Sequence, residues 1–168
     1  ADVTDPVSAA AALAGADAAV NLVGILAPGG KRTFERIHVD GAANIAAAAA
    51  SAGVRSLVQV SSLSADAHGV SVYAKTKAAG EEAARAKFPQ VSIVRPGVIM
   101  GAEDKFFNLF AGISRFSMVL PVFGCPVIPK IKLFGDDGPI DIEFYGDGGT
   151  RLQPVFVGDV ANAITAIL

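Results

Sequence analysis

The chain has 168 residues, 18% of them charged, and a formal net charge of −2 at pH 7. That length is enough for one domain with a sizeable core and short for two. The few Lys and Arg residues are scattered among acidic ones, which argues against a nucleic-acid partner.

The first elements alternate between helix and strand. In "TDPVSAAAALAGAD", Asp5 is a candidate N-cap, Pro6 occupies the first helical position and Gly15 follows the end. The apolar run "AAVNLVG" (residues 18–24) is short enough for a buried strand. A second helix is predicted over "TFERIHVDGAANIAAAAASAG", from Thr33 as its cap to Gly53 as its stop.

Two further strands and one helix continue this pattern. "RSLVQVSS" (55–62) and "VSIVRPGVIMG" (91–101) are rich in β-branched residues, and the helix that begins with "YAKTK" lies between them. Strands separated by such helices form parallel βαβ units, and nearly continuous apolar strands are covered on both faces. The sequence therefore predicts an α/β fold with a Rossmann-like, doubly wound parallel sheet.

The pattern loosens after Gly101. "DKFFNLFAGISRF" (104–116) predicts a helix, and "RLQPVFVG" (151–158) a last strand leading into a helix capped by Asp159. The insert "PKIKLFGDDGPIDIEFYGDGG" (129–149) admits a β-hairpin excursion as one interpretation. We expect one partial NAD(P)-binding Rossmann domain over 1–168, with an irregular substrate-facing or partner-facing region at about 102–150.

A mean hydropathy of +0.48 invites a membrane interpretation, but no apolar run reaches the ~18 residues that a spanning helix needs. The nearest candidate, "FSMVLPVFGCPVIP" (116–129), contains three prolines and predicts a buried or interface-lying segment. It holds the one cysteine, Cys125, which has no second Cys or nearby His to pair with. We expect an inert thiol, no disulfide and no metal site.

Three strand ends should line one crevice, because ligands of open parallel sheets bind outside the carboxyl ends of the strands. These ends are residues 21–24, the pair Ser61 and Ser62, and residues 96–98. Tyr73 and Lys77 follow the serine pair and share a helix face. The lysine ammonium would lower the phenol pKa, so that Tyr73 could exchange a proton with a substrate oxygen held by Ser62. A solvated helix with a chance Tyr and Lys is the alternative interpretation.

The motifs resemble a known family. "VNLVG", "VQVSS", "YAKTK", "IVRPGVIMG" and "QPVFVGDVANAI" occur in the order found in short-chain dehydrogenase/reductase proteins of the extended and atypical kind. Within that superfamily, "TFERIHVDGAANIAAAA", "YAKTKAAGEEA" and "GAEDKFFNLFA" are similar to the nucleotide-binding accessory subunit of respiratory complex I and its bacterial relatives. The resemblance implies a domain that holds NADP(H) or NAD(H) and serves assembly and stability more than turnover.

The resemblance also implies partners, a location and roles for residues. The partners would be subunits of a membrane-bound respiratory complex, on the matrix side of the mitochondrial inner membrane or the corresponding bacterial face. Residues matching the catalytic positions of the family are Ser62, Tyr73 and Lys77. Residues matching its cofactor-binding positions are Asp2 and Val3 at the adenine, Val23 and Gly24 at the ribose and pyrophosphate, Ser61, Tyr73 and Lys77, and Pro96, Gly97 and Val98 under the nicotinamide.

Several positions depart from the family pattern. Leu63 replaces the usual continuation of the serine strand, and only eleven positions separate Ser62 from Tyr73, so the loop that would form a substrate pocket is short. His38 stands where many relatives carry Asn, and we expect a packed or hydrogen-bonded helix histidine rather than a catalytic one. These departures argue against turnover and leave cofactor binding intact.

The front of the family pattern does not occur in this sequence. The glycine-rich phosphate-binding turn and three strands would precede Ala1, so the strand at 18–24 should present an unpaired apolar edge. We expect the 168 residues to be part of a longer polypeptide, whether or not a leader was removed.

Three functions remain open: an accessory subunit of complex I, a free-standing NAD(P)-dependent reductase, epimerase or isomerase, and a non-catalytic structural module. The choice between NAD and NADP stays open as well.

Overall fold

The computed structural model describes residues 1–104, 106–117, 130–135, 138–143 and 152–168. The chain forms two compact units, one made of Ala1–Ile99 with Val155–Leu168 and the other of Met100–Pro154.

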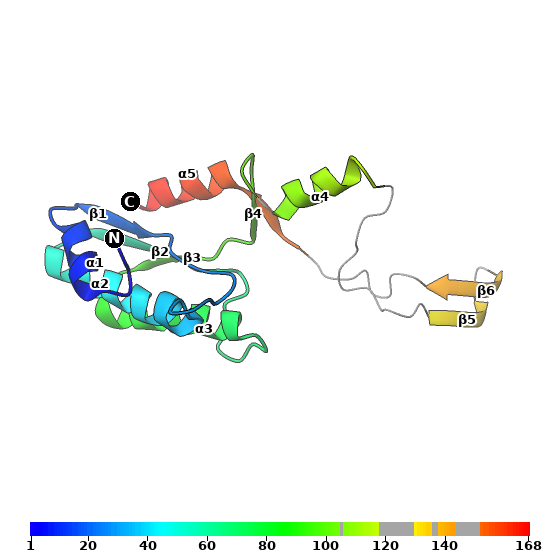
Figure 1. Ribbon diagram of the computed structural model, residues 1–168, viewed down its shortest axis with the longest axis horizontal. Helices are drawn as coiled ribbons and strands as arrows, with labels where there is room; N and C mark the ends of the chain where they lie inside the picture. The colour runs from blue at the N-terminus through cyan, green and yellow to red at the C-terminus, as the bar shows by residue number, and fades with distance from the viewer. Residues whose placement is uncertain (105, 118–129, 136–137, 144–151) are drawn as a thin grey trace. The chain divides into compact units, whose positions relative to one another are not determined.

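The first unit is built on a parallel sheet of three strands in the order β1-β2-β3 (Figure 1). Val20 of β1 pairs with Val58 of β2, and Val60 of β2 pairs with Val94 of β3. The strands are β1 (Ala18–Asn21), β2 (Ser56–Val60) and β3 (Ser92–Val94). This topology confirms the predicted α/β fold with a parallel sheet.

Helices cover both faces of this sheet, as expected for a doubly wound fold (Figure 1). One face carries α1 (Pro6–Leu13), α2 (Gly41–Ala52) and α3 (Val72–Lys87), with the π-helical turn η1 (Glu35–Asp40) leading into α2. The C-terminal helix α5 (Val157–Ile167) contacts β2 from the other face. Leu57 and Val58 are neighbours on β2, and successive side chains of a strand point to opposite faces. Their exposures of 1% and 0% show that both faces of the central strand are covered.

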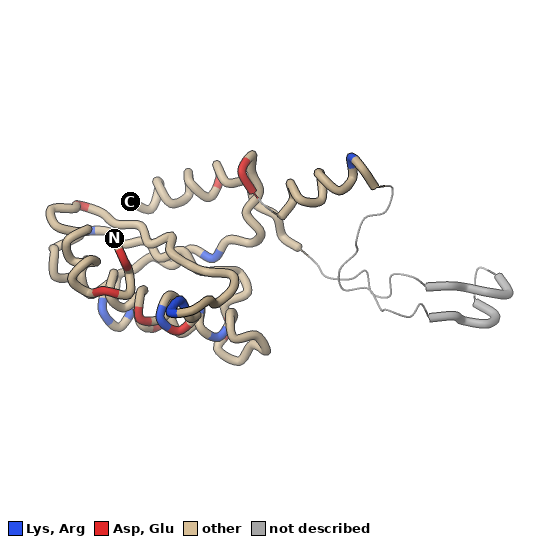
Figure 2. Tube along the Cα trace, in the orientation of Figure 1, with Lys and Arg blue, Asp and Glu red and all other residues tan. Residues whose placement is uncertain are grey.

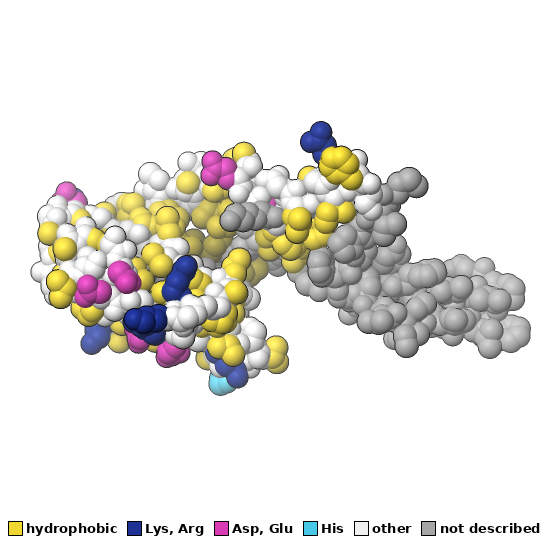
Figure 3. Space-filling view, viewed as in Figure 1, with side chains coloured by type: hydrophobic (Ala, Val, Ile, Leu, Met, Phe, Trp, Pro, Cys, Tyr) yellow, Lys and Arg dark blue, Asp and Glu magenta, His cyan; other side chains and the backbone are white. Residues whose placement is uncertain are grey.

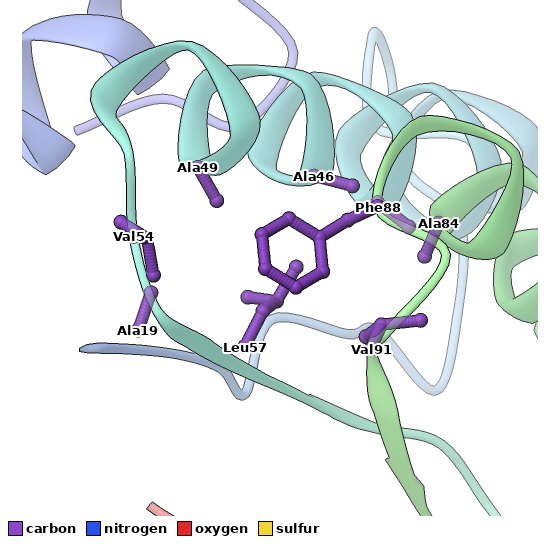
Figure 4. Packing of buried hydrophobic residues seen from close by; sticks show 9 residues of the cluster. Ala19, Ala46, Ala49, Val54, Leu57, Ala84, Phe88 and Val91 are labelled. Carbon is purple, nitrogen blue, oxygen red and sulfur yellow. The ribbon is translucent and has the colours of Figure 1, made fainter. Parts of the chain in front are cut away.

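The core lies between the sheet and helices α2 and α3 (Figure 4). Leu57 of the central strand and Phe88, just after α3, fill the space between the elements. The helical positions that face them are alanines, so the helices approach the sheet closely. The buried members are Ala19, Ala42, Ala46, Ala49, Val54, Leu57, Ala84, Phe88 and Val91.

The helix signals in the sequence are confirmed at the ends of α1 and α2. The Asp5 side chain accepts a hydrogen bond from the Val7 N–H, and Gly15 after α1 has a φ of 74°. Gly53 ends α2 with a φ of 70°, a left-handed conformation that favours glycine.

Three boundaries differ from the prediction. The helix expected to run unbroken from Thr33 begins with the π turn η1, although the Thr33 hydroxyl does accept from the Arg36 N–H at 3.2 Å. The strand expected over 91–101 divides into β3 and β4 (Val98–Met100), because Pro96 has no N–H to donate to a ladder. Helix α5 begins at Val157, so Asp159 lies in its first turn and does not cap it.

Strand β4 pairs with β7 (Pro154–Phe156) in a separate two-stranded ladder. Between these strands the second unit contains α4 (Phe106–Ser114) and an antiparallel hairpin of β5 (Lys130–Gly135) and β6 (Gly138–Glu143). The hairpin confirms that interpretation of the insert at 129–149. Cys125 and residues 118–129 of the apolar segment lie outside the described residues.

Strand β1 is an edge strand of its sheet and carries exposed apolar side chains, as the sequence predicts. Val20 of the strand is 36% exposed, and Leu22 and Val23, just after it, are 69% and 41% exposed. Apolar atoms reach the surface in several places (Figure 3). No helix in the described part of the chain has both the length and the apolar character needed to span a bilayer.

Candidate functional site

The carboxyl ends of β2 and β3 are held together by backbone hydrogen bonds. The Ser61 N–H donates to the Val94 carbonyl at 2.7 Å, and the Leu63 N–H donates to the Pro96 carbonyl at 2.9 Å. The segment containing Ser61 and Ser62 therefore runs beside the segment that leads into Gly97. Two of the three predicted strand ends lie side by side.

The carboxyl ends of these strands form a rim of the sheet, and Lys77 reaches this rim from α3. Its Nζ donates to the carbonyl oxygen of Val60, the last residue of β2, at 3.1 Å, and the residue is 7% exposed. Burial lowers the pKa of Lys77, and the negative charge of Glu81 opposes that effect. An ammonium has three N–H donors, so two remain for a ligand after the bond to Val60.

Gly24, just after β1, lies against the same ammonium. A Cβ placed on Gly24 would be 3.7 Å from Lys77 Nζ and 3.7 Å from His38 Nε2. The glycine has no side chain, so its backbone stays open to a ligand that approaches the lysine. The third strand end, with Val23 and Gly24, thereby joins Lys77 at one place.

His38 is 3% exposed and uses both ring nitrogens. Nε2 accepts the Ile25 N–H at 3.1 Å, and Nδ1 lies 3.0 Å from the Thr76 hydroxyl, which in turn lies 2.9 Å from the Val72 carbonyl. Burial and the nearby charge of Lys77 lower the His38 pKa. The ring is thus a neutral, hydrogen-bonded helix histidine, which confirms the interpretation from the sequence.

Tyr73 is half-buried in an aromatic cluster. Its ring meets His38 edge-on with centroids 5.4 Å apart, and meets Phe34 edge-on at 6.0 Å. The phenol oxygen makes no hydrogen bond to any described residue, so it is free to bond to a ligand. Tyr73 contacts His38, which in turn binds the Ile25 N–H, and Lys77 lies against Gly24. Both residues are therefore close to the segment that follows β1.

The two serines of the rim are placed differently from each other. The Ser62 hydroxyl lies 2.9 Å from the Ser64 hydroxyl and also accepts the Ser64 N–H at 3.3 Å. The structure shows no hydrogen bond between Ser62 and Tyr73 within the described ranges. The Ser61 hydroxyl is buried and has no hydrogen-bond partner there.

The N-terminal pair lies near the loop that follows β1. Val3 is buried in a cluster with Ile25 and Ile37, which brings it beside the residue after Gly24. Asp2 is exposed, and one carboxylate oxygen accepts the N–H and the hydroxyl of Thr4, both at 2.8 Å. These bonds hold the pKa of Asp2 below its usual value. The second oxygen of the carboxylate accepts no hydrogen bond from the described residues.

The sequence analysis missed an ion pair between a buried carboxylate, Glu81, and the half-exposed Arg95 beside the strand ends. Glu81 is 1% exposed, and Arg95 binds both of its carboxylate oxygens, at 2.8 and 2.6 Å. The sequence did contain a signal for this pair. Glu81 lies four positions after Lys77, and Arg95 is the first residue of the "RPG" motif.

A pocket lies beside these residues, along the loop that follows β1. It has a volume of about 350 Å³, opens beside Gly24 and reaches Arg32. The described part of the chain has no group of three His, Cys, Asp or Glu side chains that could hold a metal. Basic and acidic residues are interspersed along the first unit (Figure 2).

Comparison with known proteins gives a family match and relatives along the whole chain. A family model described as NAD(P)H-binding matches residues 1–109. Mitochondrial NADH dehydrogenase (ubiquinone) 1 alpha subcomplex subunit 9 of Arabidopsis thaliana is 32% identical over 168 residues, 99% of this chain and 36% of that protein. Ceramide reductase of Caulobacter vibrioides is 41% identical over 109 residues, 64% of this chain and 34% of that protein. The chain thus spans about a third of the length of these relatives.

The fold has counterparts among solved structures. The dTDP-4-dehydrorhamnose reductase of Bacillus anthracis, solved in complex with NADP, superimposes with a TM-score of 0.72. The superposition covers 99% of this chain and 57% of that one, at 15% sequence identity. This likeness supports the Rossmann-like architecture of the chain.

Proposed function

This chain belongs to the family of NAD(P)H-binding proteins, and from that premise we propose that it is the nucleotide-holding part of an accessory subunit of respiratory complex I. In this role the dinucleotide stabilises the subunit more than it serves turnover. One observation carries the proposal. The likeness to the Arabidopsis complex I subunit extends over 99% of the chain, whereas the family match ends at residue 109.

The residues at the rim fit such a cofactor. Lys77 has two N–H donors left for ribose hydroxyls, and Gly24 lets a ligand approach the backbone beside it. The second carboxylate oxygen of Asp2, which accepts no hydrogen bond from a described residue, would accept one from the exocyclic amine of adenine. Val23, Ser61 and the segment from Pro96 to Val98 stand at the strand ends. When bound, the nicotinamide would supply hydride chemistry.

The location follows from the same proposal. We place the subunit at the matrix face of the mitochondrial inner membrane, or at the corresponding face of a bacterial membrane, attached through other subunits. The support is the set of mitochondrial relatives, such as the Arabidopsis protein.

Gentle purification of the full-length protein from its native membrane tests this function. We expect the protein to elute with a large respiratory assembly and to release NADP(H) or NAD(H) on denaturation. Elution as a free protein with bound nucleotide would contradict the accessory role. Absence of any dinucleotide would contradict both the accessory role and enzymatic function, and would leave a structural module.

A reductase is the second candidate, and the free Tyr73 hydroxyl favours it. A half-buried phenol with no hydrogen-bond partner among the described residues, one helical turn from a buried lysine, suits proton exchange with a substrate oxygen. The 41% identity to a ceramide reductase points in the same direction. Against it, the Ser62 hydroxyl bonds to Ser64 and makes no hydrogen bond to Tyr73. A substrate-dependent change in the absorbance of the reduced nicotinamide, lost in Tyr73→Phe, would establish this candidate instead.

A further inference from the structure

Glu81 is a buried carboxylate to which the proposed function gives no role. It is 1% exposed and, together with Leu57 and Val58, belongs to the largest fully buried side chains of the described residues. A carboxylate in that position is costly unless it is paired, so its partners indicate what it does.

We propose that Glu81 is a positioning residue that keeps Lys77 protonated and fixes, through Arg95, the strand end beside it. The inference rests on the proposed nucleotide site and deepens it, because it assigns the control of the charge that the lysine presents to a ligand.

The first part of the argument is the link between α3 and the end of β3. Arg95 Nε donates to Glu81 Oε1 at 2.8 Å, and Arg95 Nη2 donates to Oε2 at 2.6 Å. A two-point bond of this kind fixes orientation as well as distance. Arg95 directly precedes Pro96, so the bond sets where the segment from Pro96 to Val98 leaves the sheet relative to the helix that carries Lys77.

The second part is the position of Glu81 on the helix. It lies one turn after Lys77, on the same face of α3, and residues at this spacing are neighbours. Lys77 is buried, and burial disfavours its ammonium form. Glu81 is the carboxylate whose charge acts on that ammonium in the opposite sense. Without this charge, Lys77 would lose its proton at a lower pH.

The other charged groups around the pair do not replace Glu81. Lys77 also faces His38 across Gly24, but a neutral or positive ring does not stabilise an ammonium. Glu81 faces Arg95, just after β3, and Arg85 from its own helix, the latter at 3.7 Å. The hydrogen bonds from Arg95 hold the Glu81 pKa low, so the carboxylate stays ionised although burial would raise that pKa.

The consequence for a ligand follows from counting donors. A protonated Lys77 gives one N–H to Val60 and has two left for ribose hydroxyls, whereas a neutral amine has fewer donors and no charge. Nucleotide affinity should therefore fall on the alkaline side as Lys77 loses its proton. Glu81 raises the pH at which this happens, against the larger effect of burial.

The test uses the full-length protein with two charge-removing variants. Glu81→Gln removes the carboxylate, and Glu81→Gln with Arg95→Met removes both partners, which avoids leaving Arg95 unpaired if the single variant folds poorly. Glu82→Gln is the matched control, because Glu82 is the next residue and its side chain is 76% exposed and bonded to Arg85. The first measurement is the titration of Lys77, followed by NMR of ¹³C-labelled lysine.

We expect the Lys77 midpoint to fall by about one pH unit or more in both Glu81 variants and to stay in place in Glu82→Gln. The second measurement is the Kd of NADPH between pH 6.5 and 9.5. The alkaline loss of affinity should begin about one unit earlier without Glu81, which means about tenfold weaker binding at the pH where the wild type still binds fully.

Two outcomes separate this inference from the proposed function. A Lys77 midpoint equal in Glu81→Gln, the double variant and Glu82→Gln overturns the inference, whether or not nucleotide binds. A lowered midpoint in a protein that binds no dinucleotide supports the inference and overturns the proposed nucleotide site.

Discussion

The Nε2 atom of His38 accepts the backbone N–H of Ile25 at 3.1 Å. Because that nitrogen is an acceptor, the ring proton lies on Nδ1 and is donated to the Thr76 hydroxyl 3.0 Å away. Thr76 lies on α3 between Tyr73 and Lys77, so a single neutral imidazole joins the loop after β1 to the helix that carries both residues. Protonation of His38 would place a proton on Nε2, which would then face the Ile25 N–H as a second donor.

Removing this imidazole should therefore loosen the loop. We expect His38→Ala to destabilise the protein by about 1–3 kcal/mol, because it leaves the buried Ile25 N–H without an acceptor. His38→Asn should recover part of that loss, since an amide oxygen can accept the same N–H. Urea unfolding at pH 7.5 measures both, and His68→Ala, at the exposed second histidine of the chain, is the control. Equal stability of His38→Ala and His68→Ala would contradict the link.

His38 should also make stability depend on pH. Its pKa in the folded protein is lower than 6.5, so as the pH falls below 6.5 the unfolded state takes up the proton first. The contribution is complete above pH 6.5 and is lost as the pH falls toward the folded pKa. Unfolding free energies measured from pH 8 to pH 5 should show a smaller slope in His38→Asn than in the wild type. The same slope in both would exclude His38 as the source.

Gly80 should not tolerate a side chain. A Cβ there would collide with the carbonyl oxygen of His38 and lie 3.8 Å from the Ala42 Cβ. Gly80→Ala should cost about 1–3 kcal/mol by overpacking, although alanine is otherwise the better helix former. Gly112→Ala is the matched control in α4, where no described atom outside the helix's own backbone lies within 4 Å of the added Cβ, and should be neutral or stabilising. Thermal unfolding that ranks the two variants in the reverse order would contradict this packing.

Lys77→Met should separate stability from ligand binding. Burial of an ammonium opposes folding at neutral pH, so an apolar side chain of similar length should change the unfolding free energy by less than about 1 kcal/mol. The lowered pKa of Lys77 means that its contribution to stability improves as the pH rises toward 10.5, a trend that Lys77→Met should lack. Nucleotide affinity, measured by calorimetry, should fall about tenfold or more with the lost charge-assisted hydrogen bonds. Unchanged affinity would remove Lys77 from the site.

Tyr73→Phe should leave stability unchanged. The phenol oxygen has no hydrogen-bond partner among the described residues, so its removal should alter the unfolding free energy by less than about 0.5 kcal/mol. The ring still packs on His38 and Phe34. Any turnover that uses the phenol as proton donor should disappear, while nucleotide affinity should change less than in Lys77→Met. A large loss of stability would reveal a partner for the hydroxyl.

Much of the first unit could be predicted from local chemistry. Asp5 and Gly53 determine helix ends through their own side chain or φ angle, and β-branched runs between helices leave little choice but a parallel sheet. The rim could be located for the same reason, because parallel strands all finish at one edge. These features depend on residues that are close in the sequence.

The other features of the site depend on contacts between elements, and the sequence does not show which elements will be neighbours. Glu81 and Arg95 are fourteen positions apart and meet only because α3 lies beside β3. The Ser62 hydroxyl bonds to Ser64 in a local turn. Ser64 thus competes with a substrate for that hydroxyl, which the motif alone does not show. Pro96 is visible in the sequence as a residue that can interrupt a strand. The separate pairing of the following strand, β4, with β7 is not.

The pairing of β4 with β7 places the start and the finish of Met100–Pro154 in neighbouring strands. An excursion whose two ends meet in a ladder can be lengthened, shortened or exchanged without pulling the flanking strands apart. Substitutions or changes of length between Met100 and Pro154 therefore need not disturb the strand ends around Lys77.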